Sequence, residues 1–203
     1  KIKKLEKEND IKIQNINDLK NISDKLTEQQ KMGLEYFGKI CTKIPRDKIE
    51  RFEKSMKEFD VKKCLFFLGS YARGSSHSGD VDILFCKFSV EEILNFISEI
   101  PFVKILDFYI KGATKTSFLM KLEDIIVHVD LHKSPEDELI FQKLYFTGSK
   151  NFNILMRKKA LSLGLKLNDK GLFRGDEKLK IKSERELFKV LEMKYKSPEK
   201  RTY

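Results

Sequence analysis

Tryptophan is absent from this 203-residue chain, and cysteine and proline are rare. The three cysteines, Cys41, Cys64 and Cys86, are odd in number, and none lies in Cys-x-x-Cys spacing. This pattern supports neither a disulfide framework nor a zinc site, and it predicts a reducing, intracellular compartment. The chain also lacks an apolar run long enough to span a bilayer and a signal-peptide pattern, so we expect no membrane partner.

Acidic side chains are outnumbered, because 31 Asp and Glu stand against 41 Lys and Arg and give a formal net charge of +10. A chain this basic suits a polyanionic partner such as nucleic acid. The alternative is compositional, since lysine-rich chains from biased genomes carry solvated charged faces without a partner. Charge alone leaves both interpretations open.

Three parts follow one another along the chain. Residues 1–42 carry many lysines and no strand pattern, and a helix is predicted after Thr27, with Gln30 at capping-box spacing. Strand patterns dominate residues 64–132, apart from a helix predicted after Ser89. From Ser134 onward the pattern is helical again. The sequence therefore predicts an α/β core between two helical parts.

Apolar spacing predicts which helix faces pack inward. A helix starting near Pro45 carries one apolar face formed by Ile49, Phe52, Met56 and Phe59. A later helix carries a second such face, formed by Phe152, Leu155, Met156 and Ala160. A last helix is predicted to begin at Ser183 and to end at Pro198.

The most informative stretch runs from Gly69 to Asp82, a Gly-Ser turn that leads into two aspartates around one apolar residue. Apolar runs flank it on both sides, so it is predicted to be a strand, a loop and a strand. Asp80 and Asp82 are two residues apart in a strand and therefore project to the same side. Two carboxylates held together favour a divalent cation, and Mg²⁺ commonly bridges carboxylates to substrate phosphates.

A third aspartate lies on an alternating strand. Over residues 125–132 every odd position is apolar, whereas His128, Asp130 and His132 share the other face. Three carboxylates on neighbouring strands can hold two metal ions roughly 3.5–4 Å apart for phosphoryl chemistry. An isolated Asp-x-Asp often only ends a strand at a turn, but the preceding Gly-Ser loop and the third aspartate favour a nucleotidyltransferase site.

These motifs, together with several others, resemble the family X DNA polymerases, of the DNA polymerase beta type. The resemblance runs from about residue 20 almost to the end of the chain and rests on residues 26–37, Ile44-Pro45-Arg46, the Gly-Ser loop with Asp80 and Asp82, Asp130, residues 144–149, Phe152-Asn153, Met156-Arg157, Ala160-Leu161 and Lys194-Tyr195-x-x-Pro198. It implies an α+β fold: a nucleotidyltransferase palm (43–135), with a mixed or antiparallel sheet and helices on one face, between a helical DNA-binding segment (1–42) and an α+β fingers part (136–203).

The resemblance also implies roles for single residues. Asp80 and Asp82 would hold two Mg²⁺ ions, for which Mn²⁺ can substitute, and Asp130 would hold the catalytic one near the primer 3′ oxygen. Residues that would bind the nucleotide are Ser70, Arg73, Gly79 and Lys43, together with the sugar- and base-facing Tyr145, Phe146, Gly148, Asn153 and Arg157. The family has a cis peptide at the position of Gly148-Ser149.

This sequence departs from the family in three respects. His128 and His132 occupy positions where polymerase beta has Arg, so primer positioning and gating would differ. No glycine precedes Gly33, so the family's Gly-x-Gly hairpin is missing and lysines would grip the DNA backbone instead. The lyase domain is expected to be absent, as in the minimal family X polymerases of large DNA viruses.

The function expected from all this is template-directed DNA synthesis, filling short gaps in repair. The partners would be gapped or primer-template DNA and deoxynucleoside triphosphates, the protein would act as a monomer, and its location would be the nucleus or a viral cytoplasmic replication site or virion. One alternative is a template-independent terminal transferase, which the short spacing between Asp130 and Tyr145 disfavours. Another is a catalytically weak scaffold that binds DNA ends, which the three intact carboxylates disfavour.

Overall fold

The computed structural model describes residues 3, 6, 7, 12–61 and 63–202. The chain divides into two compact units, Lys1–Ile40 and Cys41–Tyr203, and each is described by itself. The helical segment expected over residues 1–42 lies in part outside the described residues, namely at residues 1, 2, 4, 5 and 8–11.

The described part of the first unit is helical. It contains α2 (Ile16–Asn21), the short 3₁₀ helix η1 (Ser23–Lys25) and α3 (Glu28–Glu35). The predicted capping box at the start of α3 is confirmed, because Thr27 Oγ1 accepts a hydrogen bond from the Gln30 amide at 3.3 Å and Gln30 Oε1 accepts one from the Thr27 amide at 2.8 Å.

A mixed five-stranded sheet forms the palm in the second unit. Its strand order is β2-β4-β7-β6-β5, with bounds β2 (Leu65–Phe67), β4 (Val81–Phe85), β7 (Ile125–Lys133), β6 (Lys115–Leu122) and β5 (Val103–Lys111). Only the β4–β7 pair is parallel; the other three pairs are antiparallel. The predicted mixed sheet is therefore confirmed, and its parallel pair is the one that carries the predicted aspartates.

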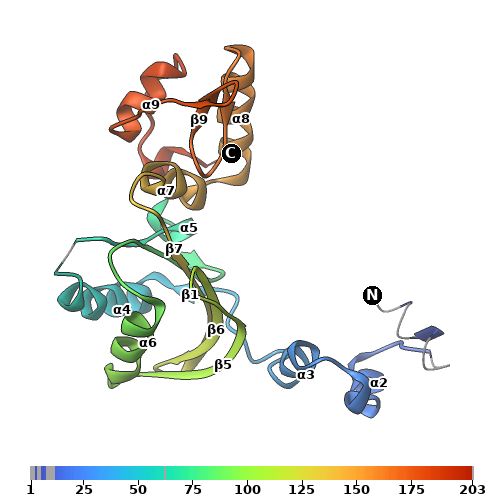
Figure 1. Cartoon of the computed structure of the whole chain (residues 1–203). Helices are drawn as coiled ribbons and strands as arrows, with labels where there is room; N and C mark the ends of the chain where they lie inside the picture. The colour runs from blue at the N-terminus through green and yellow to red at the C-terminus, as the bar shows by residue number, and fades with distance from the viewer. Residues whose placement is uncertain (1–2, 4–5, 8–11, 62, 203) are drawn as a thin grey trace. The chain divides into compact units, whose positions relative to one another are not determined.

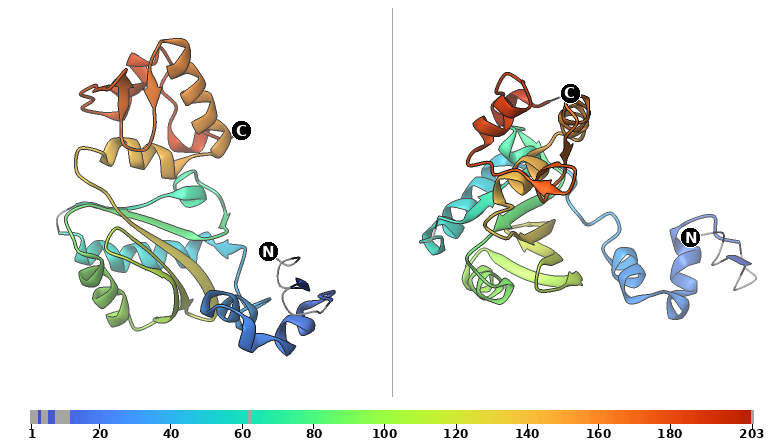
Figure 2. Two further views of the ribbon diagram at one scale, coloured as in Figure 1. Left: turned by 45° about the vertical axis from the view of Figure 1, so that its right-hand side comes forward. Right: turned by 45° about the horizontal axis from the view of Figure 1, so that its top comes forward.

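Two helices, α4 (Arg46–Phe59) and α6 (Val90–Glu99), cover one face of this sheet (Figures 1 and 2). Ile49, Phe52 and Met56 of α4 are fully buried and Phe59 packs against the same core, as the spacing predicted. Val127, Val129 and Leu131 of β7 are also fully buried and Ile125 packs against the same core, so the predicted alternation of this strand is confirmed. The other face of the sheet carries His128, Asp130 and His132 together with the buried Leu84 and Leu119.

The segment between β2 and β4 is more structured than the predicted loop. It forms the single-turn helix α5 (Gly69–Ala72) and the short strand β3 (His77–Ser78), which pairs antiparallel with β1 (Ile44–Pro45). The pairing of Ile44 with Ser78 closes the segment back onto the start of α4. Asp80 and Asp82 therefore follow a segment whose ends are held by strand pairing, β2 with β4 and β3 with β1.

The C-terminal subdomain, residues 136–202, has its own core. It contains α7 (Leu139–Thr147), α8 (Lys150–Ser162), a three-stranded sheet of β8 (Lys166–Leu167), β9 (Leu172–Arg174) and β10 (Glu177–Lys178), α9 (Glu184–Val190) and the 3₁₀ helix η2 (Pro198–Lys200). Phe152, Met156 and Ala160 are buried in this core as predicted.

Two predictions about this subdomain were wrong. Leu155 is 43% exposed rather than packed inward, because α8 contacts the core through Phe152, Met156 and Ala160 alone. The helix after Ser183 ends at Val190, with Leu191 as its C-cap, and Pro198 instead begins η2.

The number and spacing of the cysteines did not indicate the one disulfide that the structure contains. Cys64, just before β2, and Cys86, just after β4, are joined, with their Cα atoms 5.6 Å apart. The register of these antiparallel strands pairs Leu65 with Phe85, which brings the two flanking cysteines opposite each other. Their separation of 22 residues gave no sign of this, because it depends on the strand register.

No helix among the described residues combines the length and apolar character that crossing a membrane requires.

Candidate active site

Two neighbouring parallel strands bring the predicted aspartates together. Asp82 of β4 and Asp130 of β7 are direct register partners, and Asp80 immediately precedes β4. Two overlapping groups result, in which one ligand atom from each residue lies within 4.8 Å of the others: Asp80, His128 and Asp130, and Asp82, Asp130 and His132. The structure thus gathers all three carboxylates, with both histidines beside them.

Gly69 allows the loop to approach the carboxylates. Its φ is +62°, a conformation that side chains disfavour, and a Cβ atom there would lie 2.3 Å from Asp82 Oδ2. Any larger residue would displace the Asp82 side chain. The glycine of the Gly-Ser motif therefore makes room for a carboxylate as well as forming a turn.

The gathered charges raise the proton affinity of Asp82. Burial, followed by repulsion from Asp80 and Asp130, raises the pKa of Asp82 to about 7, although Arg73 and Lys115 oppose the shift. Burial also lowers the pKa of His132 to about 4, so this ring is neutral near pH 7. The site therefore concentrates negative charge that the neutral His132 ring does not offset.

A cation fits this arrangement. Asp130 Oδ1 is buried and has no hydrogen-bond partner among the described residues. A buried carboxylate oxygen without a partner is costly, and a metal ion is one group that satisfies it. The oxygen and nitrogen donors of the two groups are those that divalent ions use, so the described residues can hold a metal.

A cleft of about 550 Å³ lies next to the carboxylates. Its walls come from the α5 loop, the start of β4, the end of α7 and the first two turns of α8. The predicted residues that line it are Ser70, Arg73, Asp80, Asp82, Tyr145, Phe146, Gly148, Asn153 and Arg157. Most of the predicted nucleotide-binding residues are therefore brought to one cavity.

The α8 wall of the cleft is held by contacts with Tyr145. Asn153 donates a hydrogen bond from Nδ2 to the Tyr145 carbonyl at 2.8 Å, and the Arg157 guanidinium lies 5.5 Å from the centre of the Tyr145 ring. Tyr145 is itself 42% exposed. The amide and the guanidinium thus lie on one face of α8, at the cleft.

Arg73 connects the palm to the C-terminal subdomain. Its Nη1 donates to the Thr147 carbonyl at 2.6 Å, next to the cis peptide between Gly148 and Ser149 that the resemblance implied. Burial lowers the pKa of Arg73, while Asp82 and Asp80 raise it. A Cβ at Gly148 would lie 3.3 Å from Arg73 Nη1, so a glycine here leaves room for the guanidinium.

Five predicted residues are not among those that line the cleft. Asp130, His128 and His132 lie on β7, beside Asp80 and Asp82. Lys43 precedes β1 and Gly79 follows β3, and the pairing of these strands places the two residues next to each other.

Four residues line the cleft although the sequence reasoning did not assign them to the site: Gly69, Ser149, Lys150 and Ile154. Lys150 and Ile154 could have been found, because they share a helix face with Asn153 and Arg157 at helical spacing. Ser117 was also missed; it is buried on β6 and its Oγ lies 2.8 Å from His128 Nε2. Only the strand register reveals that contact.

Comparisons with known proteins agree with this architecture. Residues 43–151 match the family described as DNA polymerase beta palm, and residues 143–202 match the one described as DNA polymerase beta thumb. The chain is 30% identical over 145 residues to repair DNA polymerase X of African swine fever virus (isolate Pig/Kenya/KEN-50/1950). The aligned residues make up 70% of this chain and 83% of the viral protein.

Two further relatives are longer or more distant. DNA polymerase lambda of Arabidopsis thaliana is 26% identical over 230 residues, covering 92% of this chain but 41% of the plant protein. The chain thus spans less than half of that relative. The crystal structure of Leishmania infantum polymerase beta in a ternary P/T complex is similar with a TM-score of 0.78 and 25% identity, covering 94% of this chain and 89% of that one.

A mixed palm sheet that gathers three carboxylates beside a helical subdomain defines a protein of the polymerase beta class. The chain belongs to the family X DNA polymerases, as its sequence motifs predicted.

Proposed function

We propose that this chain is a template-directed DNA polymerase that extends a primer 3′ end and fills short gaps during DNA repair, inside the cell. The names of its relatives support this, since they include a repair DNA polymerase X and DNA polymerase lambda. The single observation that carries the proposal is the register of Asp82 with Asp130, with Asp80 beside them, at the edge of a cleft of about 550 Å³.

In the proposed reaction the primer 3′ oxygen forms a bond to the α-phosphorus of a deoxynucleoside triphosphate. The bond to the bridging oxygen of the β-phosphate breaks, and pyrophosphate leaves. Asp80 and Asp82 would hold two Mg²⁺ ions and Asp130 one of them. When bound, the ions supply charge neutralisation at the attacking and leaving oxygens.

The residues of the cleft would bind and orient the nucleotide. Ser70 offers a hydroxyl donor and Arg73 a guanidinium beside the carboxylates, which suits triphosphate oxygens. Asn153 and Arg157 offer donors on one face of α8, where minor-groove acceptors of a new base pair could be read. Tyr145 and Phe146, at the end of α7, would pack against the sugar.

Primer extension on gapped and blunt DNA tests this function. Each substrate is offered one nucleotide at a time and then all four, with Mg²⁺. We expect extension on gapped DNA, limited by the template to complementary nucleotides. Equal addition of any single nucleotide to blunt ends would instead indicate a terminal transferase, and DNA binding without extension would indicate a scaffold.

A further inference from the structure

The His128 ring is held in place beside the carboxylates. Its Nε2 lies 2.8 Å from Ser117 Oγ on the neighbouring strand β6. The Tyr109 ring of β5 contacts it edge-on, with 5.4 Å between ring centres and 62° between planes. Three adjacent strands therefore fix the direction of this imidazole.

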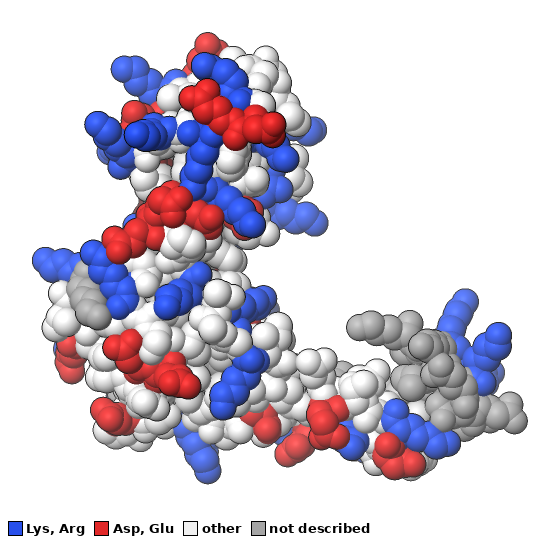
Figure 3. Space-filling model, viewed as in Figure 1, with Lys and Arg blue, Asp and Glu red and all other residues white. Residues whose placement is uncertain are grey.

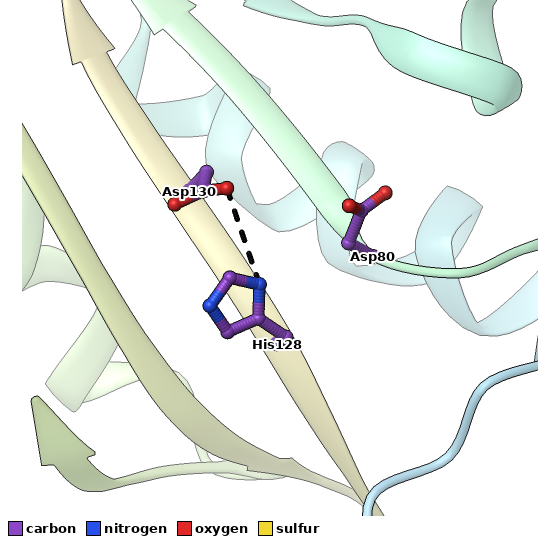
Figure 4. A group of neighbouring side chains, drawn as sticks. All are labelled: Asp80, His128 and Asp130. Carbon is purple, nitrogen blue, oxygen red and sulfur yellow. Dashed lines mark ion pairs between the residues drawn. The ribbon is translucent and has the colours of Figure 1, made fainter. Parts of the chain in front are cut away.

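The other ring nitrogen faces the site. His128 Nδ1 lies 4.0 Å from Asp130 Oδ2, a distance too long for a hydrogen bond (Figure 4). At bond lengths of about 2.0–2.1 Å and a tetrahedral angle, a metal ion would separate these two atoms by about 3.3 Å, so the side chains need to approach by only a few tenths of an ångström to share one ion. Asp80, just before the adjoining strand β4, lies across from them and completes a group within 4.8 Å (Figure 4).

The contact of Ser117 Oγ with His128 Nε2 is of the kind that usually orients a metal-binding histidine. A ligating imidazole usually donates its remaining N–H to a fixed acceptor, which sets the tautomer. With the proton on Nε2 donated to Ser117 Oγ, the lone pair of Nδ1 points toward the carboxylates. Ser117 is buried, so water competes little for this hydrogen bond.

We propose that His128 Nδ1, with Asp80 and Asp130, is a direct ligand of a divalent ion of borderline softness, such as Zn²⁺, Fe²⁺ or Co²⁺. Imidazole nitrogen favours these ions, whereas Mg²⁺ prefers an all-oxygen site. This inference rests on the proposed function and deepens it, because it adds a ligand to the same carboxylates and places an ion of this kind, instead of Mg²⁺, between Asp80, Asp130 and His128.

Histidine NMR tests the proposal without any activity assay. The chain contains only three histidines, so ¹⁵N-labelled imidazoles give a spectrum of three rings. Zn²⁺ alone is titrated into the protein without nucleotide or DNA, and Mg²⁺ is titrated separately. We expect one equivalent of Zn²⁺ to shift Nδ1 of His128 and to leave Nε2 protonated, whereas a hundredfold excess of Mg²⁺ leaves Nδ1 of His128 unshifted.

Calorimetry with matched variants measures the contribution of each ring. His128→Gln should lower Zn²⁺ affinity at least tenfold, whereas His77→Gln, at an exposed ring on β3, should not. Thermal melting checks that each variant is folded. Ser117→Ala keeps the ring and removes only its partner, so it should lower Zn²⁺ affinity about tenfold and retain the Nδ1 shift.

The proposal is overturned if Zn²⁺ leaves His128 unshifted, if it shifts His132 instead, or if His128→Gln binds Zn²⁺ as tightly as wild type. Extension of gapped DNA is measured on the same wild-type protein, with Mg²⁺ alone and with Mg²⁺ plus one equivalent of Zn²⁺ or Co²⁺. Extension without the His128 shift would defeat only the metal assignment, whereas the shift without extension would defeat only the polymerase proposal.

Discussion

Asp82 is the carboxylate of the site whose pKa is raised most clearly by burial and by its acidic neighbours. Burial and its two acidic neighbours raise its pKa to about 7, so the folded protein binds a proton more tightly at this residue than the unfolded chain does. The stability of the metal-free protein therefore falls as pH rises from about 4 to about 7, where Asp82 ionises. A bound cation would offset this destabilisation, because it would favour the ionised form of Asp82.

Asp82→Asn should stabilise the metal-free protein at pH 8, because it removes this charge while keeping the shape. The expected gain is on the order of 2 to 4 kcal/mol, and it should vanish by about pH 3, below the ordinary Asp pKa, where the unfolded and folded Asp82 are both protonated. Urea unfolding in EDTA at both pH values measures it, with Asp176→Asn, at an exposed position, as control. An equal effect at both pH values would contradict the assigned pKa.

At the level of elements, α8 combines a structural face with a face toward the cleft. Phe152, Met156 and Ala160 lie in the core, while Asn153 and Arg157 lie at the cleft beside Tyr145. Arg157→Ala should therefore lower insertion of the correct nucleotide by tenfold or more and change the ratio of correct to incorrect insertion. The reason is that a good pair of hydrogen bonds to a base edge contributes about 1–3 kcal/mol to the discrimination between the right and the wrong base.

Single-nucleotide insertion kinetics opposite one template base measure this effect. Lys158→Ala, the next residue on α8 but exposed and outside the cleft, is the matched control. DNA binding should change little in either variant. If Arg157→Ala inserted matched and mismatched nucleotides as efficiently as wild type, α8 would be a scaffold only.

The C-terminal subdomain is organised around one buried cation. The Arg201 side chain is fully buried and donates to both Glu184 carboxylate oxygens, at 2.8 and 2.9 Å, and to the Lys196 carbonyl. Its guanidinium also lies within 6 Å of the rings of Phe152, Phe188 and Tyr195. Arg201 is thus part of the core, although its sequence context is a charged tail.

Arg201→Met should destabilise the protein by about 3–5 kcal/mol, because it leaves the Glu184 carboxylate without its partner in a half-buried environment. Lys200→Ala, at the exposed neighbouring position, should change stability by less than about 0.5 kcal/mol. Urea unfolding followed by circular dichroism measures both. Equal stabilities of the two variants would show that the ion pair does not contribute.

The sequence correctly predicted the buried face of those helices and strands in which the spacing of apolar residues within the segment alone defines that face. The alternation of residues 125–132 and the apolar face of α4 are properties of a single segment, and both were confirmed. Leu155, the Cys64–Cys86 pair and Arg201 could not be predicted in this way, since each depends on which distant segment packs against it. The family resemblance identified most of the residues that line the cleft, but not Ser149, Lys150 or Ile154. The contact of His128 with Ser117 depends on the register of β6 and β7.

The whole molecule carries an excess of basic charge, and the basic side chains visible on one face are not gathered in a single patch. On the face drawn in Figure 3, Lys and Arg side chains are interspersed with acidic ones over both the palm and the C-terminal subdomain. The net charge of +10 therefore acts as a general attraction for a polyanion. Sequence-specific reading of DNA is not expected from such a distribution.

DNA affinity should accordingly depend strongly on salt and little on sequence. Each phosphate neutralised on duplex DNA adds about 0.9 to the slope of log affinity against log salt concentration, so a footprint of a few phosphates should give a slope of several units. Fluorescence anisotropy with two unrelated duplexes between low and moderate salt measures it. A slope near zero would favour the compositional origin of the lysines.

The central claim is that the three carboxylates perform template-directed nucleotidyl transfer. The most direct test is single-nucleotide insertion into a one-nucleotide gap, with each of the four template bases and each of the four nucleotides, for wild type and Asp130→Ala. Wild type should insert the complementary nucleotide opposite every base. Asp130→Ala should lose at least about 10³ in rate, because a metal ligand is removed, while its affinity for DNA stays nearly unchanged.

Asp176→Ala, at an exposed carboxylate outside the site, should insert nucleotides as wild type does and controls for loss of negative charge. Insertion by Asp130→Ala within tenfold of wild type would contradict the role of the third carboxylate, and insertion by wild type without regard to the template base would contradict template direction.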